Sequence, residues 1–182
     1  MVDVEYVKLK KADELRAIAD ELIAIQPIET KTFKFNTASL NPESSVPHLI
    51  DEISSWEKQQ KSIFVYYFSL GENADLEIVH KKITDAKTKK LAKRAYPRIN
   101  SPSKYLYVGS SRDIAKRIKE HLGFGHINTY AMNLSFWCSD LNLDVDIVCM
   151  RYDAKIKKEI IQAFEDGLWE HFKPLLGRKG AR

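Results

Sequence analysis

Apolar residues recur every three or four positions in several parts of the chain, a spacing that places them on one side of an α-helix. This pattern predicts helices over residues 10–25, 49–56, 76–95, 128–141 and 155–172. A further helix is expected directly after Asp113, where hydroxyl and carboxylate side chains precede apolar residues spaced by four. Prolines flank several of these segments and are expected to end them, because proline disrupts a helix interior.

Three other stretches have the composition of β-strands. Residues 62–68 are rich in aromatic and β-branched side chains, residues 105–108 form a shorter stretch of the same kind, and residues 143–150 alternate at first and then become wholly apolar. Uninterrupted apolar runs are typical of strands that are buried on both faces of a sheet. Residues 30–45 fit either a loop or a short strand. Three strands with flanking helices predict an α+β fold.

The order of these elements suggests how the chain is organised. Residues 1–61 are predicted to form a helical N-terminal extension, and residues 62–177 the main domain. The extension could brace the main domain, contact a partner subunit in a homodimer or help to select a target, and bracing is the plainest of these roles. An insertion over residues 69–104 carries a helix between two strands, and residues 178–182 form a short basic tail.

The formal net charge of +4 conceals a strong asymmetry along the chain. Residues 1–60 carry 7 basic and 11 acidic side chains, whereas residues 77–104 carry 9 basic and 2 acidic ones. A basic cluster on a nearly neutral protein is the electrostatic signature expected for a polyanion partner, although a solvated helix face would look similar. The side chains proposed to contact nucleic acid are those of Lys89, Lys90, Lys93 and Arg94.

Composition argues against several classes of protein. The longest aromatic and aliphatic run, residues 63–68, is far shorter than the ~20 residues needed to cross a bilayer, so no membrane segment is expected. The first residues lack the basic and then apolar order of a secretory signal, so a cytoplasmic location is expected by default. Cys138 and Cys149 have no closely spaced partner, and we interpret both as core thiols rather than as parts of a disulfide framework or zinc site.

The most informative motif lies near the middle of the chain. A short aromatic strand, Tyr105–Gly109, ends in glycine, and Arg117 and His121 follow four positions apart, so both project from one side of the predicted helix. Arg117 borders the apolar stripe of that helix, where a charge must reach solvent or find an anion. Glu165, beside the apolar stripe of the helix over residues 155–172, is a candidate partner.

These residues resemble the GIY-YIG nucleases over about residues 62–177. Phe64-Val65-Tyr66 is similar to the first motif of that family, and Tyr107-Val108-Gly109 is similar to the second. The other matches to the family pattern are Arg117, His121, Glu165 and Pro174. The resemblance implies a three-stranded antiparallel sheet packed by helices, and a metal-dependent endonuclease that hydrolyses phosphodiester bonds in DNA, such as a site-specific restriction-type enzyme.

The resemblance also implies a role for each residue. Glu165 would hold one divalent cation, Mg²⁺ or Mn²⁺, and Arg117 would contact the scissile phosphate. Tyr66 or Tyr107 would orient or deprotonate water, and His121, with an unperturbed pKa of ~6.5, would assist as a proton carrier at neutral pH. We expect these five side chains to converge around a single water-filled pocket.

The chain departs from the family at two positions. Phe64 stands where the family has glycine, and Gly177 stands where it has asparagine. Two alternatives therefore remain beside the DNA endonuclease: a nucleic-acid-binding module of the same fold without catalytic activity, and a nuclease that acts on RNA.

Overall fold

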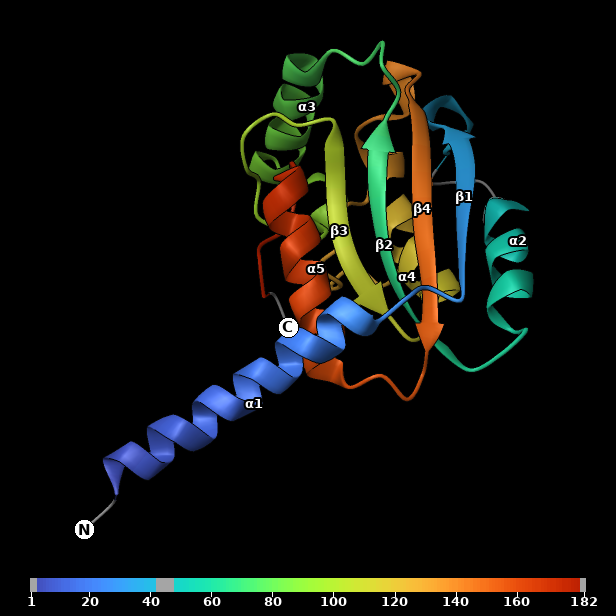
Figure 1. The fold of residues 1–182 in the computed structure, drawn as a ribbon. Helices are drawn as coiled ribbons and strands as arrows, with labels where there is room; N and C mark the ends of the chain where they lie inside the picture. The colour runs from blue at the N-terminus through green and yellow to red at the C-terminus, as the bar shows by residue number, and fades with distance from the viewer. Residues whose placement is uncertain (1–2, 42–47, 181–182) are drawn as a thin grey trace.

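A computed structural model describes residues 3–41 and 48–180 as an α+β fold built on a four-stranded antiparallel sheet (Figure 1). The strands run in the spatial order β1-β4-β2-β3, with bounds β1 Glu29–Asn36, β2 Ser62–Leu70, β3 Tyr105–Ser111 and β4 Asp144–Asp153. The α+β class is confirmed, but the prediction of three strands is wrong. The N-terminal segment adds β1 to the edge of β4, where Phe33 pairs with Ile147.

Within the described residues, five α-helices accompany the sheet: α1 Val4–Ala24, α2 His48–Glu57, α3 Leu76–Thr88, α4 Ile114–Lys119 and α5 Lys158–Phe172. All of the helices predicted outside residues 128–141 are found, with shifted ends. The helix predicted over residues 76–95 ends earlier, at Thr88, because Lys90, Ala92 and Lys93 have left-handed backbone conformations that a helix cannot contain. Asp113 caps α4 as expected, since its carboxylate accepts the Lys116 N–H.

The helix predicted over residues 128–141 is wrong. This segment forms two single 3₁₀ turns, Leu134–Phe136 and Ser139–Leu141. Asn133 and Asn142 adopt left-handed conformations, with φ of 54° and 51°, and interrupt any regular helix. Met132, Leu134 and Trp137 are nevertheless buried, so the spacing of these apolar residues reflects burial rather than helical structure, whereas Tyr130 is exposed.

The two faces of the sheet carry separate layers. On β2, the side chains of Phe64, Tyr66 and Phe68 join the larger core with residues of α2, α3 and α4. Val65 points the other way and packs with Ile161 of α5. Side chains alternate between the faces of a strand, so α4 and α5 cover opposite faces of the sheet, as Figure 1 also shows.

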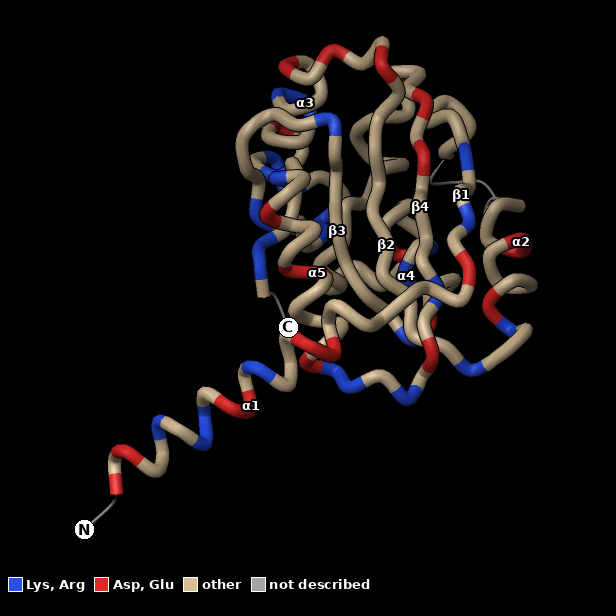
Figure 2. Tube along the Cα trace, viewed as in Figure 1, with Lys and Arg blue, Asp and Glu red and all other residues tan. Residues whose placement is uncertain are grey.

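The N-terminal segment divides into two parts that differ in burial. β1 and α2 are integrated into the core, since Ile53 and Trp56 of α2 are buried there. α1 extends away from the body in Figure 1 and Figure 2 and has no buried residue, and Glu21 in its last turn forms an ion pair with Lys157, the residue that precedes α5. Among the helices of the described residues, none is both long and apolar enough to cross a bilayer. Both cysteine thiols are free and buried, which confirms their interpretation as core residues.

Candidate active site

A β-bulge determines where Tyr107 points. Phe68 on β2 pairs with Tyr107 and the next residue, Ser69, pairs with Tyr105, so that Leu106 is an extra residue on β3. A bulge of this kind changes the face on which neighbouring side chains lie. The ring of Tyr105 therefore stacks on the last aromatic ring of α5, with 4.0 Å between centroids, whereas Tyr107 faces the α4 side.

Gly109 allows two phenol rings to lie together on that face. It is the cross-strand partner of Tyr66, and the rings of Tyr66 and Tyr107 are stacked with centroids 6.3 Å apart. A Cβ atom on Gly109 would lie 2.7 Å from the Tyr66 Oη and 2.8 Å from Cε1 of Tyr107. The glycine predicted from the motif is thus required by side-chain packing around it.

His121 lies at the base of this cluster and is completely buried. It belongs to the π-helical turn Glu120–Phe124 that follows α4. Its Nδ1 accepts the Met132 N–H at 3.3 Å, so the neutral ring carries its proton on Nε2, which lies 3.0 Å from the Tyr66 Oη. Burial, reinforced by the charge of Arg117, holds the pKa of His121 well below its usual value. The ring is therefore neutral at physiological pH and positions Tyr66, in contrast to the proton carrier expected from an unperturbed histidine.

Tyr66 shares this burial. No part of its side chain reaches solvent, and desolvation raises the pKa of its phenol well above the ordinary value. A buried phenol that keeps its proton is poorly suited to deprotonate water. Of the two tyrosines proposed for that role, Tyr107 is the one that is only partly buried and that borders a cavity.

Arg117 links α4 to this cluster. Its Nη1 donates to the Glu120 carboxylate at 2.8 Å, and its Nη2 donates to the Tyr107 Oη at 3.3 Å and to the Tyr130 carbonyl at 3.1 Å. Burial alone would lower the pKa of Arg117, but the phenols of Tyr66 and Tyr107 and the Glu120 hydrogen bond raise it above the usual value. The guanidinium remains charged with 22% of its side chain exposed, so it is accessible to an anion.

Glu165 approaches β3 from the other face of the sheet. Ser110, the residue after Gly109, pairs with Val65 on the α5 side, and its hydroxyl lies near enough to the Glu165 carboxylate to affect the pKa of that group. Burial raises the pKa of Glu165, although the Ser110 hydroxyl and the positive charge of Arg117 act in the opposite direction. The carboxylate therefore interacts electrostatically with Arg117, but the two side chains are not joined as the expected ion pair.

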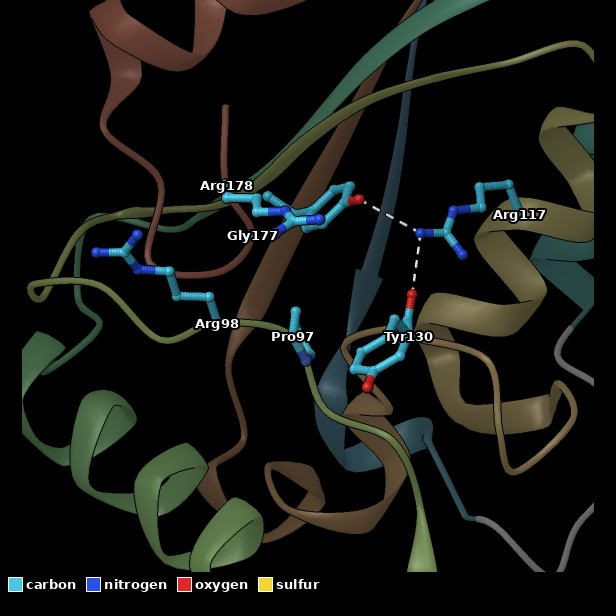
Figure 3. A pocket seen from close by; sticks show the side chains of 7 residues that line it. Pro97, Arg98, Arg117, Tyr130, Gly177 and Arg178 are labelled. Carbon is cyan, nitrogen blue, oxygen red and sulfur yellow. Dashed lines mark hydrogen bonds between the residues drawn. The ribbon is translucent and has the colours of Figure 1, made fainter. Parts of the chain in front are cut away.

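Four of the five predicted site residues are in direct contact, but the five do not surround one pocket. Tyr66, Tyr107, Arg117 and His121 form the cluster described above. A cavity of ≈ 470 Å³ beside β3 is lined by Tyr107 and Arg117, together with Pro97, Arg98, Tyr130, Gly177 and Arg178 (Figure 3). The expectation of a single shared pocket is wrong, because Tyr66 and His121 are fully buried and Glu165 is not among the residues that line the cavity.

The sequence motifs did not identify three of the residues that line the cavity: Arg98, Tyr130 and Arg178. Arg98 lay within the basic segment 77–104 and Arg178 within the basic tail, so charge was the signal available for both. Tyr130 was assigned to a helix that does not form. Backbone pairing between residues around 99 and 176 brings the two arginines together. This pairing cannot be predicted from the sequence of either segment alone.

The predicted nucleic-acid-binding residues differ in their surroundings. Lys89, Lys90 and Lys93 are exposed, close to the end of α3. Arg94 is half-buried: its Nη1 donates to the Gly125 carbonyl at 3.0 Å and to Asn133 Oδ1 at 3.2 Å, and its guanidinium lies 4.4 Å from the Phe136 ring centroid. In the described structure, Arg94 therefore joins two loops, and the three lysines are the accessible charges.

The two departures from the family pattern are accommodated by packing. Phe64 is completely buried, with its ring centroid 5.2 Å from that of Trp56, and fills the core under α2. Gly177 has a φ of +99°, and a Cβ there would lie 3.2 Å from Tyr107 Cε2. The turn around Gly177 is held by Asn100, whose side-chain amide donates to the Pro174 and Gly177 carbonyls at 2.9 and 3.0 Å.

A divalent cation at Glu165 would need oxygen ligands from the surrounding residues. Within residues 3–41 and 48–180, no group of three or more His, Cys, Asp or Glu side chains could hold a metal ion. The neighbouring Asp166 accepts hydrogen bonds from Gln162 and from the Gly180 N–H. Glu165 with the Ser110 hydroxyl supplies a small set of hard oxygen ligands, which suits an ion such as Mg²⁺ that keeps most of its waters.

Comparisons with protein-family models, with curated proteins and with solved structures found no match to this chain.

Proposed function

We propose that this protein is a metal-dependent DNA endonuclease that resembles the GIY-YIG nucleases and hydrolyses phosphodiester bonds beside β3. The observation that carries the proposal is the contact between Tyr107 and Arg117 at the wall of a cavity that two further arginines also line. A charged guanidinium next to a phenol in such a cavity is suited to bind a phosphate and to position a nucleophilic water beside it.

Arg117 has the role of binding the scissile phosphate. Its guanidinium is planar and permanently charged, and it can contact two phosphate oxygens at once, which lysine cannot do. Glu120 and the Tyr130 carbonyl orient it in the absence of substrate. The negative charge on the phosphoryl oxygens grows toward the transition state, so this contact would strengthen as the reaction proceeds.

Tyr107 has the role of orienting or deprotonating the water nucleophile, since it borders the cavity and its oxygen accepts a hydrogen bond from Arg117. Tyr66 and His121 are assigned to positioning: the His121 Nε2–H holds the Tyr66 phenol, whose ring stacks beside that of Tyr107. This assignment narrows the choice between the two tyrosines that the sequence left open.

Glu165 is the residue that would hold the divalent cation, with the Ser110 hydroxyl as its neighbour. When bound, Mg²⁺ or Mn²⁺ would neutralise charge on the phosphoryl oxygens and the leaving oxygen. Because the uncharged form of Glu165 is favoured by burial, the carboxylate would lose its charge, and with it its affinity for a cation, at a higher pH than an exposed glutamate.

One observation favours a second candidate function, a nucleic-acid-binding module without catalysis. Glu165 does not line the cavity that contains Arg117, and its helix, α5, packs on the opposite face of the sheet through Ile161. If substrate binding does not bring the two together, the cavity would bind a phosphate backbone without cleaving it.

Incubation of purified protein with supercoiled plasmid and Mg²⁺ or Mn²⁺ tests the proposal. We expect wild-type protein to nick or linearise the plasmid and Glu165→Gln to be inactive while it binds the same DNA in EDTA with unchanged affinity. Binding without cleavage by the wild type would support the module and overturn the nuclease. Cleavage of RNA alone would identify an RNA nuclease, and full activity of Glu165→Gln would refute the role of Glu165.

A further inference from the structure

The cavity beside β3 contains more positive charge than one scissile phosphate requires. Arg98, Arg117 and Arg178 line it, and none of the described residues that line it is acidic. In the view of Figure 3, Arg98 lies at one end, Arg117 at the other, and the guanidinium of Arg178 lies between them near Gly177. A row of guanidinium groups matches the repeating phosphates of a nucleic-acid strand better than it matches a single anion.

Two of these arginines have no partner within the described part of the chain. Neither Arg98 nor Arg178 uses its guanidinium in a hydrogen bond or ion pair there, and both residues are exposed. Arg117, in contrast, is held by Glu120, Tyr107 and the Tyr130 carbonyl. The charges of Arg98 and Arg178 are therefore available to a ligand without the loss of an existing contact.

The backbone around these two arginines is well anchored. The Gly177 N–H donates to the Arg98 carbonyl at 2.9 Å, and Ile99 and Leu176 form a β-bridge. Leu175 and Leu176 also donate to the carbonyls of Tyr105 and Leu106 on β3, at 2.8 and 2.9 Å. Both segments are thus fixed to the strand that carries Tyr107. A preorganised backbone reduces the entropic cost of binding.

Tyr130 supplies an aromatic surface on the same cavity. Its residue is 69% exposed, and Figure 3 shows its ring next to Pro97, across the cavity from Arg178. An exposed aromatic ring beside a positively charged groove is the arrangement on which proteins stack the unpaired bases of a single strand. A base inside a duplex is already stacked on its neighbours and offers no face to such a ring.

From this arrangement we infer that the cavity is a subsite for an unpaired segment of the DNA strand next to the scissile phosphate. Arg98 and Arg178 each bind one backbone phosphate, and Tyr130 stacks on an unpaired base. The inference rests on the proposed function for the position of the scissile phosphate at Arg117. It adds that the preferred substrate has a single-stranded stretch, such as a gap or flap, at that point.

The test uses equilibrium binding, so that it does not depend on catalysis. Glu165→Gln protein in EDTA is titrated into a fluorescent single-stranded oligonucleotide and into a fully paired duplex of the same sequence. Tyr130→Ala in this background should weaken binding to the single strand by about 5- to 150-fold, the range expected for one stacked base, and should change duplex binding by less than about twofold. Tyr130→Phe should bind as tightly as the parent.

The arginines are tested by salt dependence. Arg98→Gln and Arg178→Gln should each reduce the slope of log affinity against log salt for the single strand by about 0.7, the value for one phosphate contact. Arg16→Gln on α1 is the matched control, since it removes the same charge from an exposed arginine on the helix that extends away from the body. It should leave the slope unchanged.

The outcomes separate the two proposals. If these binding effects are found but wild-type protein cleaves no DNA, the subsite stands and the nuclease proposal fails. If the protein cleaves DNA but Tyr130→Ala weakens single-strand and duplex binding equally, or neither arginine variant changes the salt slope, the subsite is refuted. A preference of the parent protein for the fully paired duplex would also refute it.

Discussion

Replacement of Gly109 by alanine tests whether the phenol cluster is held together by the absence of a side chain. The added Cβ would lie 2.7 Å from the Tyr66 Oη and 2.8 Å from Tyr107 Cε1, closer than carbon atoms approach such groups in folded proteins. Tyr66 is completely buried and hydrogen-bonded to His121, and both features hold its ring in place. Tyr107, half-buried at the cavity, is the ring that must shift.

The magnitude follows from the cost of overpacking. Insertion of one methyl group into a tightly packed site typically costs about 1–3 kcal/mol. For a chain of this size, each kcal/mol lowers the melting temperature by about 2–4 °C, so Gly109→Ala should lower it by about 2–12 °C. Displacement of Tyr107 should also break its 3.3 Å hydrogen bond with Arg117 and reduce cleavage.

Thermal unfolding followed by circular dichroism, together with plasmid cleavage, measures both effects. Gly167→Ala is the matched control, since a Cβ at Gly167 in the middle of α5 would meet no atom within 4 Å. That change should stabilise the protein by about 0.5–1 kcal/mol, because alanine is a better helix former than glycine. A Gly109→Ala variant as stable and as active as the wild type would show that the ring arrangement around Gly109 is incorrect.

Three further predictions concern surface charge, a buried carboxylate and the N-terminal helix. Replacement of the three exposed lysines near the end of α3 by glutamine should reduce the slope of log DNA affinity against log salt by up to about 0.9 per lysine. Arg94→Gln should instead lower the free energy of unfolding by about 1–3 kcal/mol, because its hydrogen bonds join two loops. An unchanged slope in the lysine variant would contradict the exposure of these lysines to DNA, and unchanged stability in the arginine variant would contradict the structural role of Arg94. The pKa of Glu165 is raised in the folded state, so the stability that its neutral form provides is complete below ~4.3 and is lost as the pH rises through the folded-state value. Urea unfolding should accordingly show Glu165→Gln to be more stable than wild type at pH 7.5 and nearly equal to it at pH 4, and a wild type that is the more stable at pH 7.5 would oppose this. Removal of residues 1–16 should leave the melting temperature within about 2 °C of the wild type, since α1 has no buried residue, and a larger decrease in differential scanning calorimetry would mean that residues 1–16 pack against the body.

Helices and strands whose apolar residues recur at a single regular spacing were predictable from the sequence. The strand β2 and the helix α5 appear close to their expected positions, because the periodicity of a segment depends only on its own residues and on which side of it is buried. The same reasoning failed for residues 128–141, where Met132, Leu134 and Trp137 are buried from irregular turns. It also left β1 undecided, since an edge strand is stabilised by the neighbour with which it pairs.

For the candidate site, the sequence was sufficient to select Tyr66, Tyr107, Arg117, His121 and Glu165 as residues of interest. It did not reveal that His121 is neutral and buried, that Glu165 lies on the α5 side of the sheet, or that Arg98 and Arg178 line one cavity. Spacing along a helix or strand specifies only neighbours within that element. The bulge at Leu106, the burial of an ionisable group and the meeting of two distant arginines each depend on contacts between segments far apart in the chain, which form only when the whole sheet has assembled.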